Sequence, residues 1–134
     1  MKRRYFCPAC NANLNPNVKV ILMARKGGDK GLILLSPQPG NYQVIVADEI
    51  QLTDDDLVDF HCPVCGVSLT AETNSTLAHL RFRFSTGREG VVYFSRRYGE
   101  HATYLVADDQ VSTYGDDAMP DPHMNFFGSG QVED

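Results

Sequence analysis

The four cysteines of this 134-residue chain form two C-x-x-C pairs, Cys7 with Cys10 and Cys62 with Cys65. The spacing lets the two thiolates of one tight turn point toward a common centre. Two such turns supply the four sulfur ligands of a tetrahedral Zn²⁺ ion, at Zn–S distances of about 2.3 Å. The sequence therefore predicts one structural metal site that joins two segments separated by 51 residues.

Both turns also have the backbone chemistry that such a site needs. A proline follows the first cysteine of each pair, Pro8 in one turn and Pro63 in the other, and fixes φ there. The residue after the second cysteine is Asn11 or Gly66, and these residue types most easily adopt positive φ. We expect this conformation to direct backbone N–H groups toward the sulfurs.

Other uses of the same cysteines have to be considered. A disulfide framework is typical of secreted chains, whereas the N-terminus reaches Cys7 without an apolar signal-peptide core. A thioredoxin-like redox site needs only one motif, in a βαβ setting that we do not find. Iron remains the main alternative metal, and Zn²⁺ is the ion that we expect. His61 is adjacent to Cys62, but a strand residue leading into the turn is its simpler interpretation.

The segments CPACN (7–11) and CPVCG (62–66) resemble the paired knuckles of the zinc-ribbon and rubredoxin-like superfamily. The resemblance covers about ten residues and implies one structural metal held by Cys7, Cys10, Cys62 and Cys65. It implies no substrate, because such ribbons serve in many processes. The segment between the two knuckles is longer than usual for a ribbon, so it must have structure of its own.

The sequence also indicates an internal repeat. Segments 26–36 (KGGDKGLILLS) and 85–95 (STGREGVVYFS) align at an offset of 59 residues, and Gly40 and Gly99 keep this offset. The knuckles themselves are offset by 55 residues, which small insertions would explain. We therefore interpret the chain as a single domain, residues 1–115, built from two tandem repeats at 1–58 and 59–115.

Strand patterns dominate both predicted repeats. Runs of β-branched and alternating apolar residues are separated by turn residues, and no long amphipathic helical period occurs. We expect strands at 18–25, 32–35, 42–47, 77–84, 91–97 and 102–106. Segments 48–56 and 108–116 are compatible with either helical turns or loops. The predicted fold class is all-β, with two knuckle-plus-β-meander repeats that share one Cys₄ metal site.

Charge and hydropathy limit where the protein acts. The net charge is −5, yet five of the 17 acidic residues and none of the 12 basic ones lie at 116–134. We expect this acidic tail to be flexible, which leaves residues 1–115 electrically balanced. No apolar run approaches the roughly 18 residues that cross a bilayer, so we expect no membrane contact. Together with the N-terminus, this predicts a cytoplasmic protein.

The motifs point to binding rather than catalysis. Four cysteines would close the coordination of the metal, and no G-x-S-x-G, H-E-x-x-H or phosphate-loop motif occurs. We therefore expect no enzyme activity and find no evident small-molecule substrate. The expected function is binding of another macromolecule, a protein above all, as an accessory or regulatory module.

Two alternatives remain open. A nucleic-acid-binding ribbon would use arginines that are interleaved with aromatic residues in the second half, namely Arg81, Arg83, Arg88, Arg96 and Arg97. The alternation of residues 81–84 also fits a simpler pattern, with arginines facing water and aromatics facing the core. The second alternative is a rubredoxin-like electron carrier with iron in the Cys₄ site.

Overall fold

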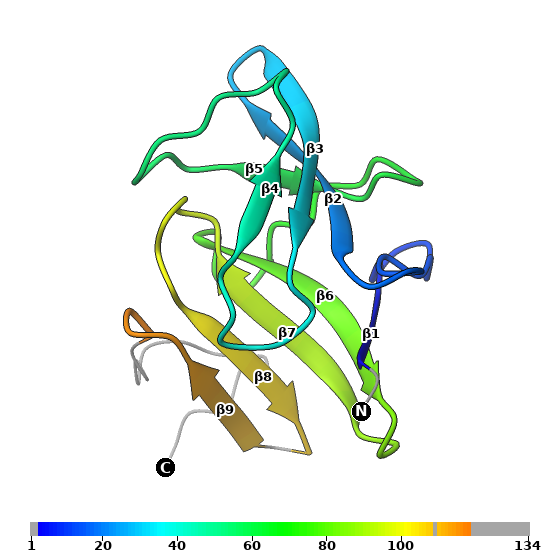
Figure 1. Ribbon diagram of the computed structural model, residues 1–134. Helices are drawn as coiled ribbons and strands as arrows, with labels where there is room; N and C mark the ends of the chain where they lie inside the picture. Colours follow the sequence, from blue (N-terminus) through cyan, green and yellow to red (C-terminus); the bar gives the residue numbers. More distant parts are fainter. Residues whose placement is uncertain (1–2, 109, 119–134) are drawn as a thin grey trace.

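Strands are the only regular elements in the computed structural model, which describes residues 3–108 and 110–118 (Figure 1). Within this part of the chain no helix is long and apolar enough to cross a membrane. The all-β prediction is confirmed. The strands are β1 (Arg3–Phe6), β2 (Val20–Lys26), β3 (Asp29–Leu35), β4 (Val44–Val46), β5 (Asp59–His61), β6 (Leu77–Phe84), β7 (Glu89–Ser95), β8 (Thr103–Ala107) and β9 (Gln110–Tyr114).

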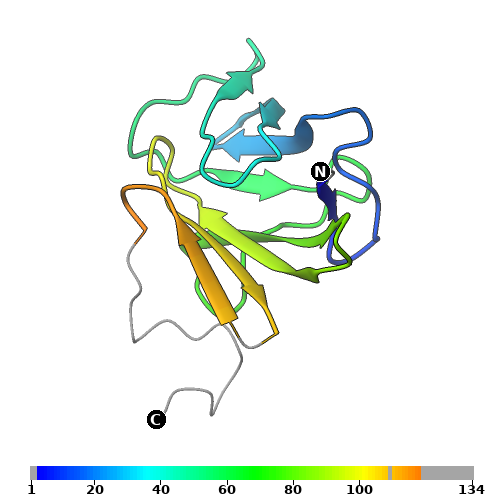
Figure 2. The same ribbon diagram turned by 60° about the horizontal axis from the view of Figure 1, so that its bottom comes forward.

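The strands form two antiparallel sheets that pack face to face, as Figure 2 shows in profile. One sheet has five strands in the order β1-β6-β7-β8-β9, and the other has four in the order β4-β3-β2-β5. The two sheets thus take strands from both halves of the chain. β1 leaves its own half to pair with β6, and β5 pairs in return with β2.

Each half of the chain gives one strand to the sheet of the other half, and the two sheets have matching strand orders. The order β1-β6-β7-β8 in one sheet corresponds to β5-β2-β3-β4 in the other, with β9 as an addition. Two halves related by a two-fold axis would produce this arrangement, in which each half completes the sheet of the other. The tandem duplication itself stays a prediction, and the interlocking of the two sheets is a property of the fold.

The core lies between the sheets and follows from strand alternation. On β6, Leu80 and Phe82 are buried, whereas Arg81 and Arg83 face outward, as the sequence predicts. The four-stranded sheet contributes inward side chains of the same kind, and Leu22 on β2 is fully buried. The two sheets therefore share one apolar layer, and both knuckles adjoin it.

Segment 108–116 differs from its expected helical turn or loop, because it contains β9. The sequence of β9, QVSTY, has little apolar alternation, so its pattern alone indicates no strand. It forms because β8, which is buried along its whole length, offers a free edge for pairing from Thr103 to Ala107.

The boundary predicted for the acidic tail falls within a turn that is bonded to the body of the protein. The Asp117 side chain accepts a hydrogen bond from the His101 amide at 2.9 Å, and Ala118 packs against the outer side of the five-stranded sheet. The rest of the predicted tail, residues 119–134, lies outside the described residues.

Candidate metal centre

The four cysteine sulfurs lie together, as the sequence predicts. All four Sγ atoms are within 4.8 Å of one another. The Sγ atoms of Cys7 and Cys65 are 3.8 Å apart, and so are those of Cys10 and Cys62. A tetrahedron with centre-to-corner distances of about 2.3 Å has edges of about 3.8 Å, so this spacing fits a tetrahedral metal–thiolate site. Each of these close pairs joins one knuckle to the other.

Backbone amides converge on the first sulfur of each knuckle. In the first knuckle, the amides of Ala9 and Cys10 donate to Cys7 Sγ at 3.3 and 3.4 Å. The second knuckle repeats both hydrogen bonds at the same lengths, with Cys62 Sγ as the acceptor. These donors stabilise the negative charge that a metal-bound thiolate carries.

The positive φ predicted after each second cysteine is confirmed. Asn11 has φ 65° and Gly66 has φ 80°. In this conformation each amide donates to the carbonyl of the first cysteine of its knuckle, Cys7 or Cys62, at 2.9 Å in both turns. The two knuckles are therefore built by the same backbone geometry.

Strands and core residues hold the knuckles in place. β1 leads into the first knuckle and β5 into the second. The chain then returns beside its own strand, with Leu14 donating to the Tyr5 carbonyl and Leu69 donating to the Phe60 carbonyl, both at 2.8 Å. All four side chains are buried, so each knuckle is anchored in the shared core.

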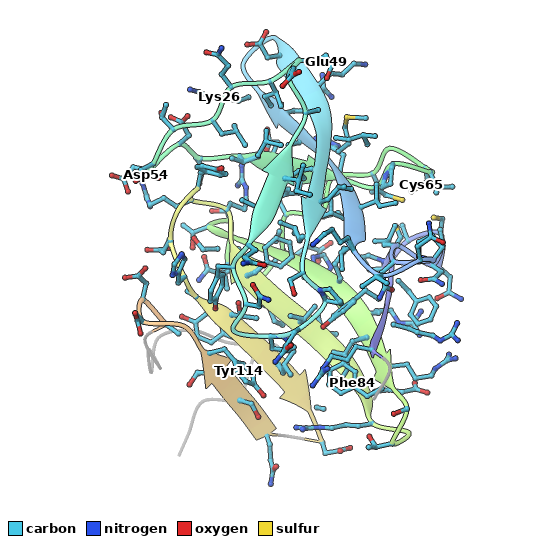
Figure 3. The ribbon with its side chains drawn as sticks, in the orientation of Figure 1. Lys26, Glu49, Asp54, Cys65, Phe84 and Tyr114 are labelled. Atoms are coloured by element: carbon cyan, nitrogen blue, oxygen red, sulfur yellow. The ribbon has the colours of Figure 1, made fainter. Side chains whose placement is uncertain are left out.

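The two cysteines of each knuckle differ in burial. Cys7 and Cys62 directly follow β1 and β5 and are buried, whereas Cys10 and Cys65 lie at the knuckle tips and are exposed. Figure 3 labels Cys65 at the edge of the molecule, so one side of the site faces solvent. His61 is not among the residues whose ligand atoms cluster here, and its Nδ1 lies 3.1 Å from the Gly66 carbonyl.

The electrostatics of the thiols favour a bound cation. Burial raises the pKa of Cys7, but the amides of Cys10 and Ala9 outweigh this effect and bring the pKa down to about 7. The Ala12 amide lowers the pKa of Cys10, yet desolvation and the neighbouring thiols raise it to about 12. The Cys7 thiol is thus prepared for ionisation, whereas the Cys10 thiol resists it. A metal cation removes this conflict by binding all four as thiolates.

The structure does not bring the five arginines of the nucleic-acid hypothesis together. Arg96 is buried and bonded within the protein. Its Nε donates to the Val58 carbonyl at 2.9 Å, Nη1 donates to the Ser75 carbonyl, and Nη2 pairs with Asp59 at 2.6 Å. Its neighbour Arg97 is exposed and lies in the β7–β8 loop.

Arg81 and Arg83 do share a surface, the outer side of the β1–β6 pair. The Arg81 Nη1 donates to the Asn11 side chain at 2.6 Å, next to the first knuckle. The Arg83 guanidinium lies 5.2 Å from the centre of the Phe6 ring and pairs with Glu89 at 3.2 Å. Arg88 lies at the nearby β6–β7 hairpin.

The strand exchange adds residues that the sequence analysis missed. Arg4 stands opposite Arg83 in the β1–β6 pairing, and Phe6 stands opposite Arg81. Only the pairing of β1 with a strand about 75 residues away reveals this group, so no local pattern indicates it.

The fold and the site together define an all-β protein of two sheets with a four-cysteine cluster, which fits a zinc-ribbon-like fold. Comparison of the chain with protein-family models, with curated proteins and with solved structures gave no match.

Proposed function

We propose that this protein is a structural-zinc module whose single Zn²⁺ fastens two interlocked sheets and whose surface binds another macromolecule. The observation that carries the proposal is the cluster of four sulfurs drawn from both knuckles, whose spacing fits a tetrahedral metal site. Four thiolates leave no open position on the ion, and such closed sites are structural rather than catalytic. The same donor set would also hold iron, so the identity of the metal is part of the proposal.

A protein partner is supported by the outer face of the four-stranded sheet. There the apolar side chains of three neighbouring strands adjoin one another, with Ile21 opposite Leu34 and Leu34 opposite Ile45. Met23 and Leu32 form a second pair beside them. We call these five residues the apolar face. Leu32 is 44% exposed and Ile45 is 54% exposed, which is unusual for adjoining large apolar residues of a monomer.

The outward side chains of the five-stranded sheet differ from the apolar face in their burial. The outer side of this sheet carries Tyr93 and Tyr104, which are 9% and 2% exposed and pack in a small second core with Ala71. The outer side of the five-stranded sheet is thus buried around Tyr93 and Tyr104, whereas the apolar face of the four-stranded sheet is open. We therefore propose that a protein partner covers the apolar face.

Replacing Leu32 and Ile45 together with Glu is expected to abolish capture of the partner from the source cell. Both side chains are exposed, so the fold and metal content should be retained, which thermal unfolding and metal analysis would check. The matched control is Val111→Glu, an exposed apolar residue of β9 in the other sheet. Capture of the same proteins by the double variant and by the wild type would refute this docking face.

A second candidate, nucleic-acid binding, is favoured by the group on β1 and β6. Arg4, Arg81 and Arg83 surround the exposed side of Phe6, and among the described residues Glu89 is the acid that pairs with them there. Arginine beside an aromatic ring is the combination that contacts phosphates and stacks on bases.

If this surface binds RNA, replacing Arg81 with Gln should weaken binding to single-stranded RNA and reduce the salt slope of log K by roughly one. The control is Arg25→Gln, an exposed arginine on β2 of the other sheet. Equal losses of RNA affinity in the two variants, or no salt-dependent RNA binding by the wild type, would exclude nucleic-acid binding by this surface.

A further inference from the structure

A cavity of about 330 Å³ lies between the two sheets and opens to solvent. Its mouth is formed by the β3–β4 loop, residues 36–43, and the β7–β8 loop, residues 96–102. These loops occupy corresponding places in the two halves, and each contains a glycine with positive φ, Gly40 at 91° and Gly99 at 85°. Figure 3 labels Asp54, a residue of the mouth, on the opposite side of the molecule from Cys65. The cavity is therefore separate from the metal centre.

The interior of the cavity is apolar and contributed by both sheets. Val20 and Ile33 line it from the four-stranded sheet, and Leu80 and Val92 line it from the five-stranded sheet. A volume of this size and an apolar interior are typical of small-molecule sites, in which a few polar groups at one end orient the ligand.

Aromatic rings form much of the remaining wall. Phe60 and Phe94 lie with ring centroids 5.4 Å apart, and Tyr42 stacks on His101 at 4.3 Å with an interplanar angle of 3°. The Tyr42 hydroxyl is also fixed, by Thr103 Oγ1 at 2.8 Å. The wall is thus preorganised to accept a flat ring system, with little ordering left to occur on binding.

The charges at the mouth indicate the sign of the ligand. Two carboxylates, Asp54 and Glu100, and one guanidinium, Arg97, line it. The Arg97 Nη1 donates weakly to a backbone carbonyl at 3.4 Å, and Glu100 accepts from the Ser95 hydroxyl. Asp54 has no hydrogen-bond or ion-pair partner among the residues that the structure describes. The net charge of the mouth is therefore negative, and the Asp54 carboxylate is available there to accept hydrogen bonds from a ligand.

We propose that this cavity binds a small aromatic amine, with its ring system among the aromatic walls and its ammonium group at the Asp54 side of the mouth. Aromatic walls attract an organic cation further through their ring faces. This site is independent of the proposed macromolecule binding, because it uses neither the apolar face nor the β1–β6 surface.

The charge preference can be tested on the full-length, metal-loaded protein with three probes of one shape: 2-naphthylmethylamine, 2-naphthalenemethanol and 2-naphthoate. Isothermal titration calorimetry should give one site for the amine, with a Kd about tenfold lower than that of the neutral alcohol and with 2-naphthoate weakest. Binding of the carboxylate as tightly as the amine, or no binding of any probe, would overturn the proposal.

The position of the bound amine can be tested by replacing two neighbouring carboxylates in turn. Asp54→Asn should weaken the amine about five-fold and leave the affinity of the alcohol unchanged. The control Asp55→Asn alters the same exposed acidic run outside the cavity, at a position of φ 75° that Asn tolerates. Filling the cavity from β4 with Val44→Trp should remove binding of both probes. Equal effects of Asp54→Asn and Asp55→Asn would place the amine elsewhere and contradict the proposal.

Discussion

Stripping the metal with a strong chelator is expected to lower the Tm of this protein by about 20 °C. The four sulfurs join knuckles that belong to different sheets, so loss of the ion removes the link at that end of the molecule. Structural zinc contributes an apparent ~10–16 kcal/mol in small domains. In this protein the shared β-core also stabilises the fold, so the metal need not supply all of the stability. A loss of only about 5 kcal/mol in the free energy of unfolding already lowers the Tm by roughly 15–25 °C.

A ligand variant isolates the contribution of the metal from that of packing. Cys65 is exposed, so Cys65→Ser removes a metal ligand with little change in the core. Its Tm in buffer should match that of the chelated wild type, and the chelator should change it no further. A wild-type Tm that is insensitive to chelation, or a full additional effect of the chelator on Cys65→Ser, would contradict the shared structural site.

Replacing Arg96 with Ala is expected to cost about 3 kcal/mol in the free energy of unfolding. The change leaves the carbonyls of Val58 and Ser75 without their buried donor. The pair with Asp59 adds little to this estimate, since the Asp59 side chain is 54% exposed. Arg96→Lys should recover only a small part, because one ammonium group cannot reach three acceptors that lie in different directions.

The neighbouring residue is the control for this prediction. Arg97 is exposed, and Arg97→Ala should change the free energy of unfolding by no more than about 0.5 kcal/mol. Urea denaturation of the metal-loaded proteins would measure both values. Equal losses for the two variants would show that the internal hydrogen bonds of Arg96 do not support the fold.

Local features of this protein can be predicted from its sequence. The knuckle geometry depends on a few consecutive residues, so the C-x-x-C spacing and the identity of Asn11 and Gly66 suffice to indicate it. The alternation of Leu77–Phe84 predicts both the bounds of β6 and the side of each residue. These signals are strong because the interactions that they describe lie within one turn or one strand.

Features that depend on partners distant in the chain could not be predicted in this way. Alternation shows which side of β1 is buried but does not show that β1 pairs with β6. Nothing in the dipeptide of Arg96 and Arg97 indicates that the first side chain is buried and the second exposed, since this follows from the carbonyls that surround Arg96. The cavity likewise exists only because two distant loops meet across the sheets.

The central claim is that one metal ion is shared by both knuckles, and its most direct test is metal stoichiometry by native mass spectrometry. We predict a colourless protein with one Zn²⁺ per chain, and complete loss of that ion in Cys65→Ser, although the first knuckle is intact in that variant. Retention of metal by Cys65→Ser, two ions per chain, or a red iron chromophore in the purified wild type would contradict it.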